Sequence, residues 1–131
     1  TLAWVKSLDR EAVEQAIARS QVAQVGWKAQ TALQRADVLW AWYNLMQQNK
    51  EQLAQILTAE QGKPLAEARG EIAYAASFIR WFAEQARRID GEVLTPTLAH
   101  QRLLVIKQEI GVTAAITPRT SRITTRCFIT Y

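Results

Sequence analysis

The stretch from Asn49 to Arg88 reads NKEQLAQILTAEQGKPLAEARGEIAYAASFIRWFAEQARR, and it decides the fold class because two helical patterns flank a break. Glycine ends helices readily and proline is tolerated in a first turn, so Gly62 and Pro64 mark that break. We predict one helix from about Asn49 to Gly62 and a longer helix from Pro64 to about Arg88. Apolar residues at helical spacing should face the core: Leu53, Ile56, Leu57, then Leu65, Ala68, Ile72, Ala75, Ile79, Phe82 and Ala86.

Two further helices are predicted upstream of this stretch. The first spans residues 7 to 25, with Ser7 or Asp9 as its cap and Gly26 as its stop. The second opens at Thr31, which forms a capping-box pattern with Gln34. Their expected apolar stripes are Val13, Ala16, Ile17, Ser20 and Ala23 in the first, and Leu33, Ala36, Leu39, Trp40, Tyr43 and Met46 in the second.

The hydrophobic period changes after the helices. Residues 102–107 are rich in aliphatic side chains with charged ends, which is typical of a strand. A uniformly apolar run over residues 112–116 favours a strand buried on both faces of an α/β sheet. A single buried strand forms no sheet, so we predict the mostly helical first part of an α/β fold, with one or two strands and a missing sheet partner.

Composition limits the function classes. The 131 residues suit one domain or part of one, and the net charge of +4 comes mainly from late basic residues. The lone Cys127 excludes an internal disulfide and favours a reducing compartment. No run approaches the ~18 apolar residues of a membrane span. The chain starts at Thr1 instead of methionine, so we expect its front end to be trimmed or unrecorded.

Several motifs carry a family resemblance. The segments Glu60 to Ala68, Gly70-Glu71-Ile72, Phe78 to Glu84 and Gln108 to Pro118 resemble the aldehyde dehydrogenase family, and within it the bacterial succinate-semialdehyde dehydrogenases. The likeness covers almost everything from Ser7 to Pro118. Glu109 departs from the pattern, since the family usually has proline there.

The resemblance implies a division of the chain. Residues 1–98 would be the helical flank of a Rossmann-like cofactor-binding domain, and 99–111 a strand resembling the oligomerisation arm. Residues 112–118 would be the first strand of the dinucleotide-binding core, and 119–131 a divergent tail. In that tail, Arg119-Thr120-Ser121-Arg122 stands where the family continues with Trp-Asn-Phe-Pro.

The resemblance also implies a function. Full-length members oxidise an aldehyde with NAD or NADP, using a cysteine nucleophile and a glutamate base that lie far beyond residue 131. Ile116, Thr117 and Pro118 are the only residues expected near the cofactor. We therefore expect a cytoplasmic, homo-oligomeric parent that oxidises succinate semialdehyde or a related aldehyde. This chain alone should have no catalytic residue, no activity and little or no bound cofactor.

Other readings stay open beside this one. Five tryptophans in a basic chain are also compatible with a nucleic-acid-binding module, although Trp40 and Trp81 should fill a core and Trp42 should meet a missing partner surface. A helical module that docks on full-length subunits is the second alternative. Glu67 and Glu71 lie one helical turn apart on a face interpreted as solvated. His100 stands without a second metal ligand, and Cys127 is read as an ordinary thiol.

Overall fold

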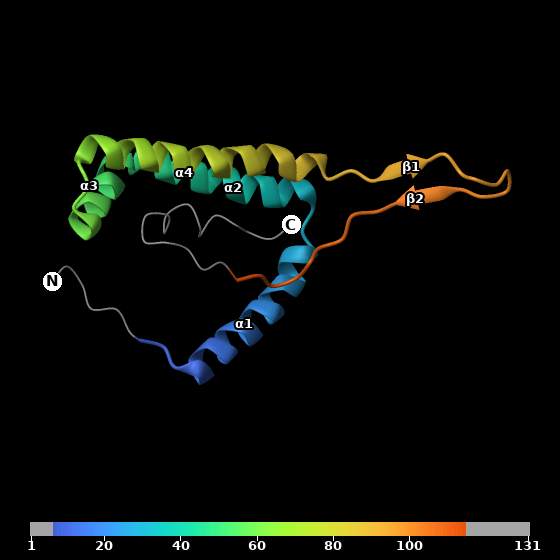
Figure 1. Ribbon diagram of the computed structural model, residues 1–131, viewed down its shortest axis with the longest axis horizontal. Coiled ribbons are helices and arrows are strands. Elements are labelled where there is room, and N and C mark those ends of the chain that lie inside the picture. Colours follow the sequence, from blue (N-terminus) through green and yellow to red (C-terminus); the bar gives the residue numbers. More distant parts are fainter. Residues whose placement is uncertain (1–6, 115–131) are drawn as a thin grey trace.

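The computed structural model describes residues 7–114, which form four α-helices followed by a hairpin (Figure 1). This content confirms the predicted fold class, a mostly helical piece with one or two strands. Helices α2 and α4 lie side by side, α3 packs at one end of α4, and α1 extends away from the pair (Figure 1). The elements are α1 (Arg10–Lys28), α2 (Ala32–Gln48), α3 (Lys50–Gln61), α4 (Leu65–Gln85), η1 (Ala86–Arg88), β1 (Glu92–Leu94) and β2 (Leu103–Val105).

The starts of α1 and α2 follow from their capping residues. The Asp9 carboxylate accepts a hydrogen bond of 2.8 Å from the Ala12 backbone amide, which satisfies one of the free donors of the first turn. At α2 the predicted capping box is confirmed. The backbone amide of Gln34 donates to the Thr31 hydroxyl at 3.3 Å, and the backbone amide of Thr31 donates to the side-chain oxygen of Gln34 at 2.8 Å. Both helices therefore begin where a side chain replaces the missing backbone partner.

The predicted stop of α1 at Gly26 is wrong. The helix continues through Gly26 to Lys28, and the amide of Ala29 still donates to the Val25 carbonyl at 3.2 Å. A glycine inside a helix weakens it by only about 1 kcal/mol, which the surrounding helix-forming residues can outweigh. Glycine therefore marked a permitted end without enforcing one.

The corner between α3 and α4 is built by its glycine and proline, as the sequence predicted. Gly62 adopts the left-handed conformation with φ 74°, and its amide donates to the Thr58 carbonyl at 2.7 Å. Pro64 directly precedes the first residue of α4. Asn49 does not cap α3 through its side chain, because its amide group donates back to the Leu45 carbonyl of α2 at 2.8 Å.

The core lies between α2, α3 and α4, where the apolar stripes of the three helices meet. Ile72 and Ile79 at its centre are each 1 % exposed. Trp40, Trp42 and Tyr43 pack against it, and the rings of Trp40 and Tyr43 meet edge to face. The buried cluster consists of Leu39, Met46, Ala54, Leu57, Ala68, Ile72, Ala75, Ala76, Ile79 and Ala83.

Part of the predicted stripes is not buried. Helix α1 contributes no buried residue, and its Val13 and Ile17 remain 47 % and 46 % exposed. Leu33 of α2 and Ile56 of α3 are about half exposed as well. Periodicity identified the apolar faces, but within residues 7–114 only α2, α3 and α4 present those faces to one another.

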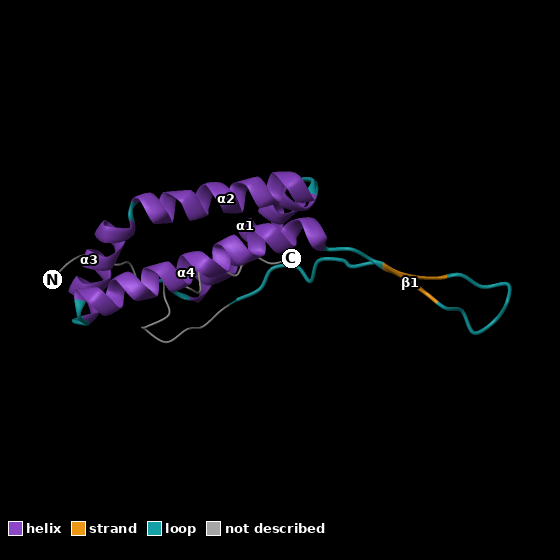
Figure 2. Ribbon diagram, turned by 90° about the horizontal axis from the view of Figure 1, so that it is seen from above, coloured by secondary structure: helices purple, strands orange, loops and turns teal. Residues whose placement is uncertain are grey.

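The strand predicted over residues 102–107 is confirmed in its centre as β2, and it pairs antiparallel with β1, which the sequence reading missed. Val93 lies opposite Leu104 in this register. A Cβ at Gly91 would lie 2.3 Å from the Val105 carbonyl oxygen, so glycine permits the two sides of the hairpin to approach each other there. The hairpin projects well beyond the helices (Figure 2).

The second predicted strand begins at the edge of the described residues. Val112 to Ala114 belong to no strand, and Ala115 to Pro118 lie outside the described residues. The proposed domain division at residues 112–118 therefore stays a prediction, as does the divergent tail at 119–131. Over residues 7–114, no helix combines the length and the apolar character that crossing a bilayer requires.

Candidate functional site

The predicted cofactor residues Ile116, Thr117 and Pro118 lie outside the described residues, as does Cys127. In α/β proteins a dinucleotide binds at the carboxyl ends of parallel strands. The sheet in residues 7–114 is a two-stranded antiparallel hairpin, which offers no such edge. Residues 7–114 therefore do not by themselves fit a nicotinamide cofactor, and no step of a reaction can be assigned to them.

The described residues also bring together no evident catalytic or metal-binding group. His100 lies in the exposed turn of the hairpin, and residues 7–114 contain no cluster of three side chains able to hold a metal ion. Glu67 is exposed, but the side chain of Glu71 is only 20 % exposed and forms an ion pair with Lys63. The interpretation of Glu71 as part of a solvated face is therefore wrong, because it joins the segment before α4 to the helix itself.

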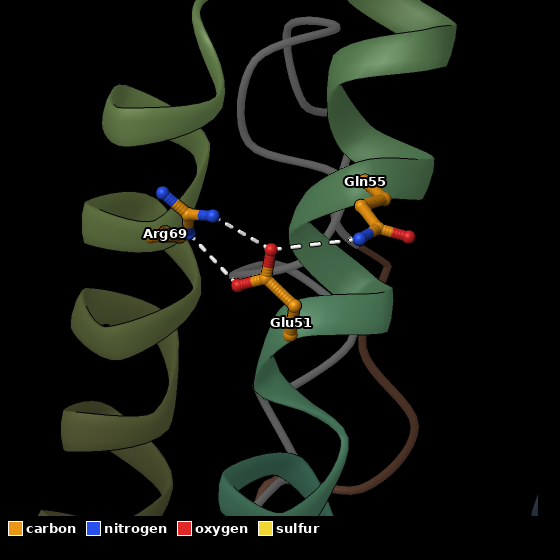
Figure 3. Close-up of polar contacts among 3 residues, drawn as sticks. All are labelled: Glu51, Gln55 and Arg69. Carbon is orange, nitrogen blue, oxygen red and sulfur yellow. Dashed lines mark hydrogen bonds and ion pairs between the residues drawn. The ribbon is translucent and has the colours of Figure 1, made fainter.

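A second ion pair fastens α3 to α4. Arg69 donates two hydrogen bonds to the Glu51 carboxylate, at 2.8 Å from Nε and 2.7 Å from Nη2, and Gln55 adds one at 3.5 Å (Figure 3). The Arg69 hydrogen bonds lower the pKa of Glu51 below its ordinary range. The planar fork of the guanidinium matches the carboxylate, so the contact fixes direction as well as charge. Its role is structural.

A cleft of about 610 Å³ lies where α1, α2 and the end of α4 meet the segment 107–110. Its walls combine the half-buried rings of Trp27 and Phe82 with several charged side chains. The charged residues lining it are Lys28, Arg35, Arg88, Lys107 and Glu109. This cleft was not predicted from the sequence.

Two of these lining residues form an ion pair with each other. Lys28, in the last turn of α1, forms an ion pair with Glu109, and its hydrogen bond lowers the pKa of that carboxyl group. The departure from proline at position 109 was the sequence signal that could have pointed here. A carboxylate at this position ties the segment that follows the hairpin back to the first helix.

The hairpin exposes several apolar side chains. Val93, Leu104 and Ile106 are 79 %, 71 % and 74 % exposed. Exposed apolar strands with free edges are templates for pairing with another strand. Within residues 7–114, the structure is thus a helical unit with a projecting hairpin (Figure 2), and both α1 and the hairpin leave apolar side chains exposed.

Comparison with known proteins identifies the family of this chain. The chain belongs to the aldehyde dehydrogenase family, whose model matches residues 1–119. It is 51 % identical over 117 residues to the NADP⁺-dependent succinate-semialdehyde dehydrogenase of Escherichia coli, covering 89 % of this chain and 24 % of that protein. It is 56 % identical over 103 residues to the glutarate-semialdehyde dehydrogenase of Pseudomonas putida, covering 79 % of this chain and 22 % of that protein.

The fold agrees with solved structures of the family. An aldehyde dehydrogenase from Brucella melitensis matches with a TM-score of 0.90 at 49 % identity, over 94 % of this chain and 26 % of that one. The chain thus corresponds to the amino-terminal portion of these proteins and spans about a quarter of their length. The predicted family membership is confirmed.

Proposed function

We propose that the protein to which this chain belongs oxidises a short aldehyde that also carries a carboxylate, most directly succinate semialdehyde, to the corresponding diacid with NAD or NADP. The observation that carries this proposal is the 51 % identity to the Escherichia coli succinate-semialdehyde dehydrogenase. The Pseudomonas putida relative is named for glutarate semialdehyde, which has the same two functional groups on a longer chain. The shared substrate chemistry is an aldehyde at one end and a carboxylate at the other.

In this proposal the present chain supplies support and no chemistry. Aldehyde oxidation requires a nucleophile, a base and a bound hydride acceptor, and residues 7–114 provide no such set. The buried cluster of α2, α3 and α4 gives the flank its own rigidity. The exposed apolar faces of α1 then offer a surface on which the remainder of a cofactor-binding domain can pack.

The hairpin is the proposed oligomerisation arm. Its strands project away from the helices (Figure 2) and every residue of both strands is exposed. A strand edge of this kind gains hydrogen bonds and buries apolar area when it joins a sheet. In a homo-oligomer of the full-length protein, β1 and β2 would extend a sheet of a neighbouring subunit.

The two alternatives fare differently. Trp40 and Trp42 pack against the core, so they offer no free faces for stacking on bases. The expectation that Trp81 fills the core is wrong, because its side chain is 57 % exposed. Docking on intact subunits is favoured by the apolar hairpin, and it uses the same surface as the proposed oligomerisation arm.

A chimera tests the proposal directly. Residues 1–118 of this chain replace the corresponding region of the Escherichia coli enzyme, and the oxidation of succinate semialdehyde is followed by formation of the reduced nicotinamide. We expect a soluble oligomer that retains succinate-semialdehyde activity. The control chimera carries Leu104→Asp in the hairpin and should lose oligomerisation. A folded, cofactor-loaded chimera that oxidises other aldehydes but rejects succinate semialdehyde would contradict the proposal.

A further inference from the structure

The cleft of about 610 Å³ is lined by residues between Gln24 and Ile110. It is formed by the end of α1, the first half of α2, the end of α4 and the segment 107–110. Its volume falls within the range of roughly 300–1,000 Å³ typical of small-molecule sites. The question is which chemistry its lining selects.

The charges on its walls do not balance. Four cationic side chains line the cleft with a single carboxylate, Glu109, and that carboxylate is already paired with Lys28. Arg35 is half buried and donates from Nη1 to the Gln30 carbonyl oxygen at 2.5 Å, which fixes its guanidinium without neutralising it. Arg88 and Lys107 form no ion pair within residues 7–114. Within residues 7–114, three cationic side chains of this lining therefore have no acidic partner.

Helix ends account for only part of this arrangement. Positive side chains near a helix C-terminus offset the helix dipole, which explains Lys28 at the end of α1 and Arg88 after α4. Lys107 has no such role, because it lies on the non-helical segment that follows β2. A cation brought to the same cleft from a different element points to an anionic occupant.

The remaining walls suit a carbon skeleton. Trp27 and Phe82 are half buried and line the cleft together with the buried side chain of Leu39. Apolar walls with a few placed charges are the usual composition of a site for a small organic ligand. A bare inorganic ion would use the charges but leave these walls in contact with water.

We propose that this cleft binds a small organic polyanion carrying at least two acidic groups. Arg35, Arg88 and Lys107 contact the acidic groups, and Trp27 and Phe82 contact the carbon body. Binding at this cleft does not depend on the proposed dehydrogenase chemistry. Carboxylates and phosphates share the required chemistry, and the experiment separates them.

Isothermal titration calorimetry of the 131-residue chain with citrate, inorganic phosphate and propionate, all at one ionic strength set with sodium chloride, tests this proposal. We expect saturable binding of one citrate per chain, weaker binding of phosphate, and no saturable binding of the monoanion propionate. Phosphate binding more tightly than citrate would overturn the assignment of an organic ligand. Propionate binding as tightly as citrate would overturn the polyanion site.

Matched variants locate the site. Arg88→Gln and Lys107→Gln should each weaken citrate binding about three- to fivefold, and both together about tenfold or more, since each removes one exposed charge contact. Arg87→Gln and Arg102→Gln each remove one positive charge from a position that does not line the cleft. These two variants should leave citrate binding unchanged. Equal weakening by both sets would show general charge attraction and overturn the site. If the double variant fails to fold, the two single variants and the propionate comparison decide.

Discussion

Lys28, in the last turn of the first helix, is ion-paired with Glu109, which lies beyond the hairpin near the end of the described residues. This contact ties α1, which buries no residue of its own, to the segment that leaves the hairpin. Residues far apart in the sequence thus meet at the cleft, and the pair holds one of its walls.

Glu109→Gln should loosen the segment 107–110. The Lys28 hydrogen bond lowers the pKa of Glu109 from its ordinary value of 4.5, so the pair contributes stability above that pH and loses it as the pH falls through the folded-state pKa. The protection factors of backbone amides near residue 109, which correct for the intrinsic pH dependence of hydrogen exchange, should fall severalfold in the variant, and also in the unsubstituted chain in acid. Gln108→Glu is the control that adds an acid without removing the pair. Exchange that is identical in the variant and the unsubstituted chain at neutral pH would show that the pair does not restrain this segment.

Arg69→Lys should weaken the fastening of α3 to α4. Lysine keeps the charge but cannot form the two parallel hydrogen bonds that Arg69 makes with Glu51 (Figure 3). We expect the thermal midpoint, followed by circular dichroism, to fall by less than about 5 °C, as is usual for an exposed ion pair. Arg19→Lys on α1 is the matched control. A drop of the same size in both variants would mean that the bidentate geometry contributes nothing.

Ile72→Ala should be strongly destabilising. Its side chain is 1 % exposed at the centre of the core, and removing it leaves a cavity that the neighbouring helices cannot fill. The free energy of unfolding measured in urea should fall by about 2–5 kcal/mol. Ile56→Ala makes the same chemical change at a position that is 48 % exposed, and should cost much less. Similar losses in the two variants would contradict the described core.

Alanine at two glycines should act in opposite directions. Gly62 ends α3 with φ 74°, so Gly62→Ala should cost about 1–2 kcal/mol of stability. Gly26 lies inside α1 with no atom within 4 Å of an added Cβ, so Gly26→Ala should raise the helix content and gain about 0.5–1 kcal/mol. Urea unfolding of both variants measures the two signs. A gain of stability at position 62 would contradict the end of α3 at Gly62, and a loss of stability at position 26 would contradict the course of α1 through Gly26.

The comparison of sequence with structure separates local from distant information. The capping box at Thr31 and the turn at Gly62 involve neighbouring residues, and both are confirmed. Strand β1 escaped prediction because Glu92–Leu94 has only three residues and is defined by its pairing with β2. The apolar stripes were visible, but which of them meet depends on packing between helices. Val13 and Ile17 show this, since their stripe has no partner within residues 7–114.

The cleft could not be predicted from the sequence, because it is formed by residues that are far apart in the chain. The cleft draws its lining from α1, α2, α4 and the segment 107–110, and no local pattern links these elements. Glu109 stood out only through the family resemblance, and its partner Lys28 could not be named from spacing. Trp81 shows the opposite failure, because helical spacing placed beside the core a ring that the fold leaves exposed.

We propose that this chain supports a dehydrogenase without performing its chemistry. An activity assay of the purified 131-residue chain tests this proposal. The chain is produced in a host lacking its own succinate-semialdehyde dehydrogenase and incubated with succinate semialdehyde and either NAD⁺ or NADP⁺, beside the Escherichia coli enzyme at equal molar concentration. We expect no formation of reduced nicotinamide above the protein-free control with either cofactor. Turnover that rises in proportion to the amount of chain and vanishes without succinate semialdehyde would contradict it.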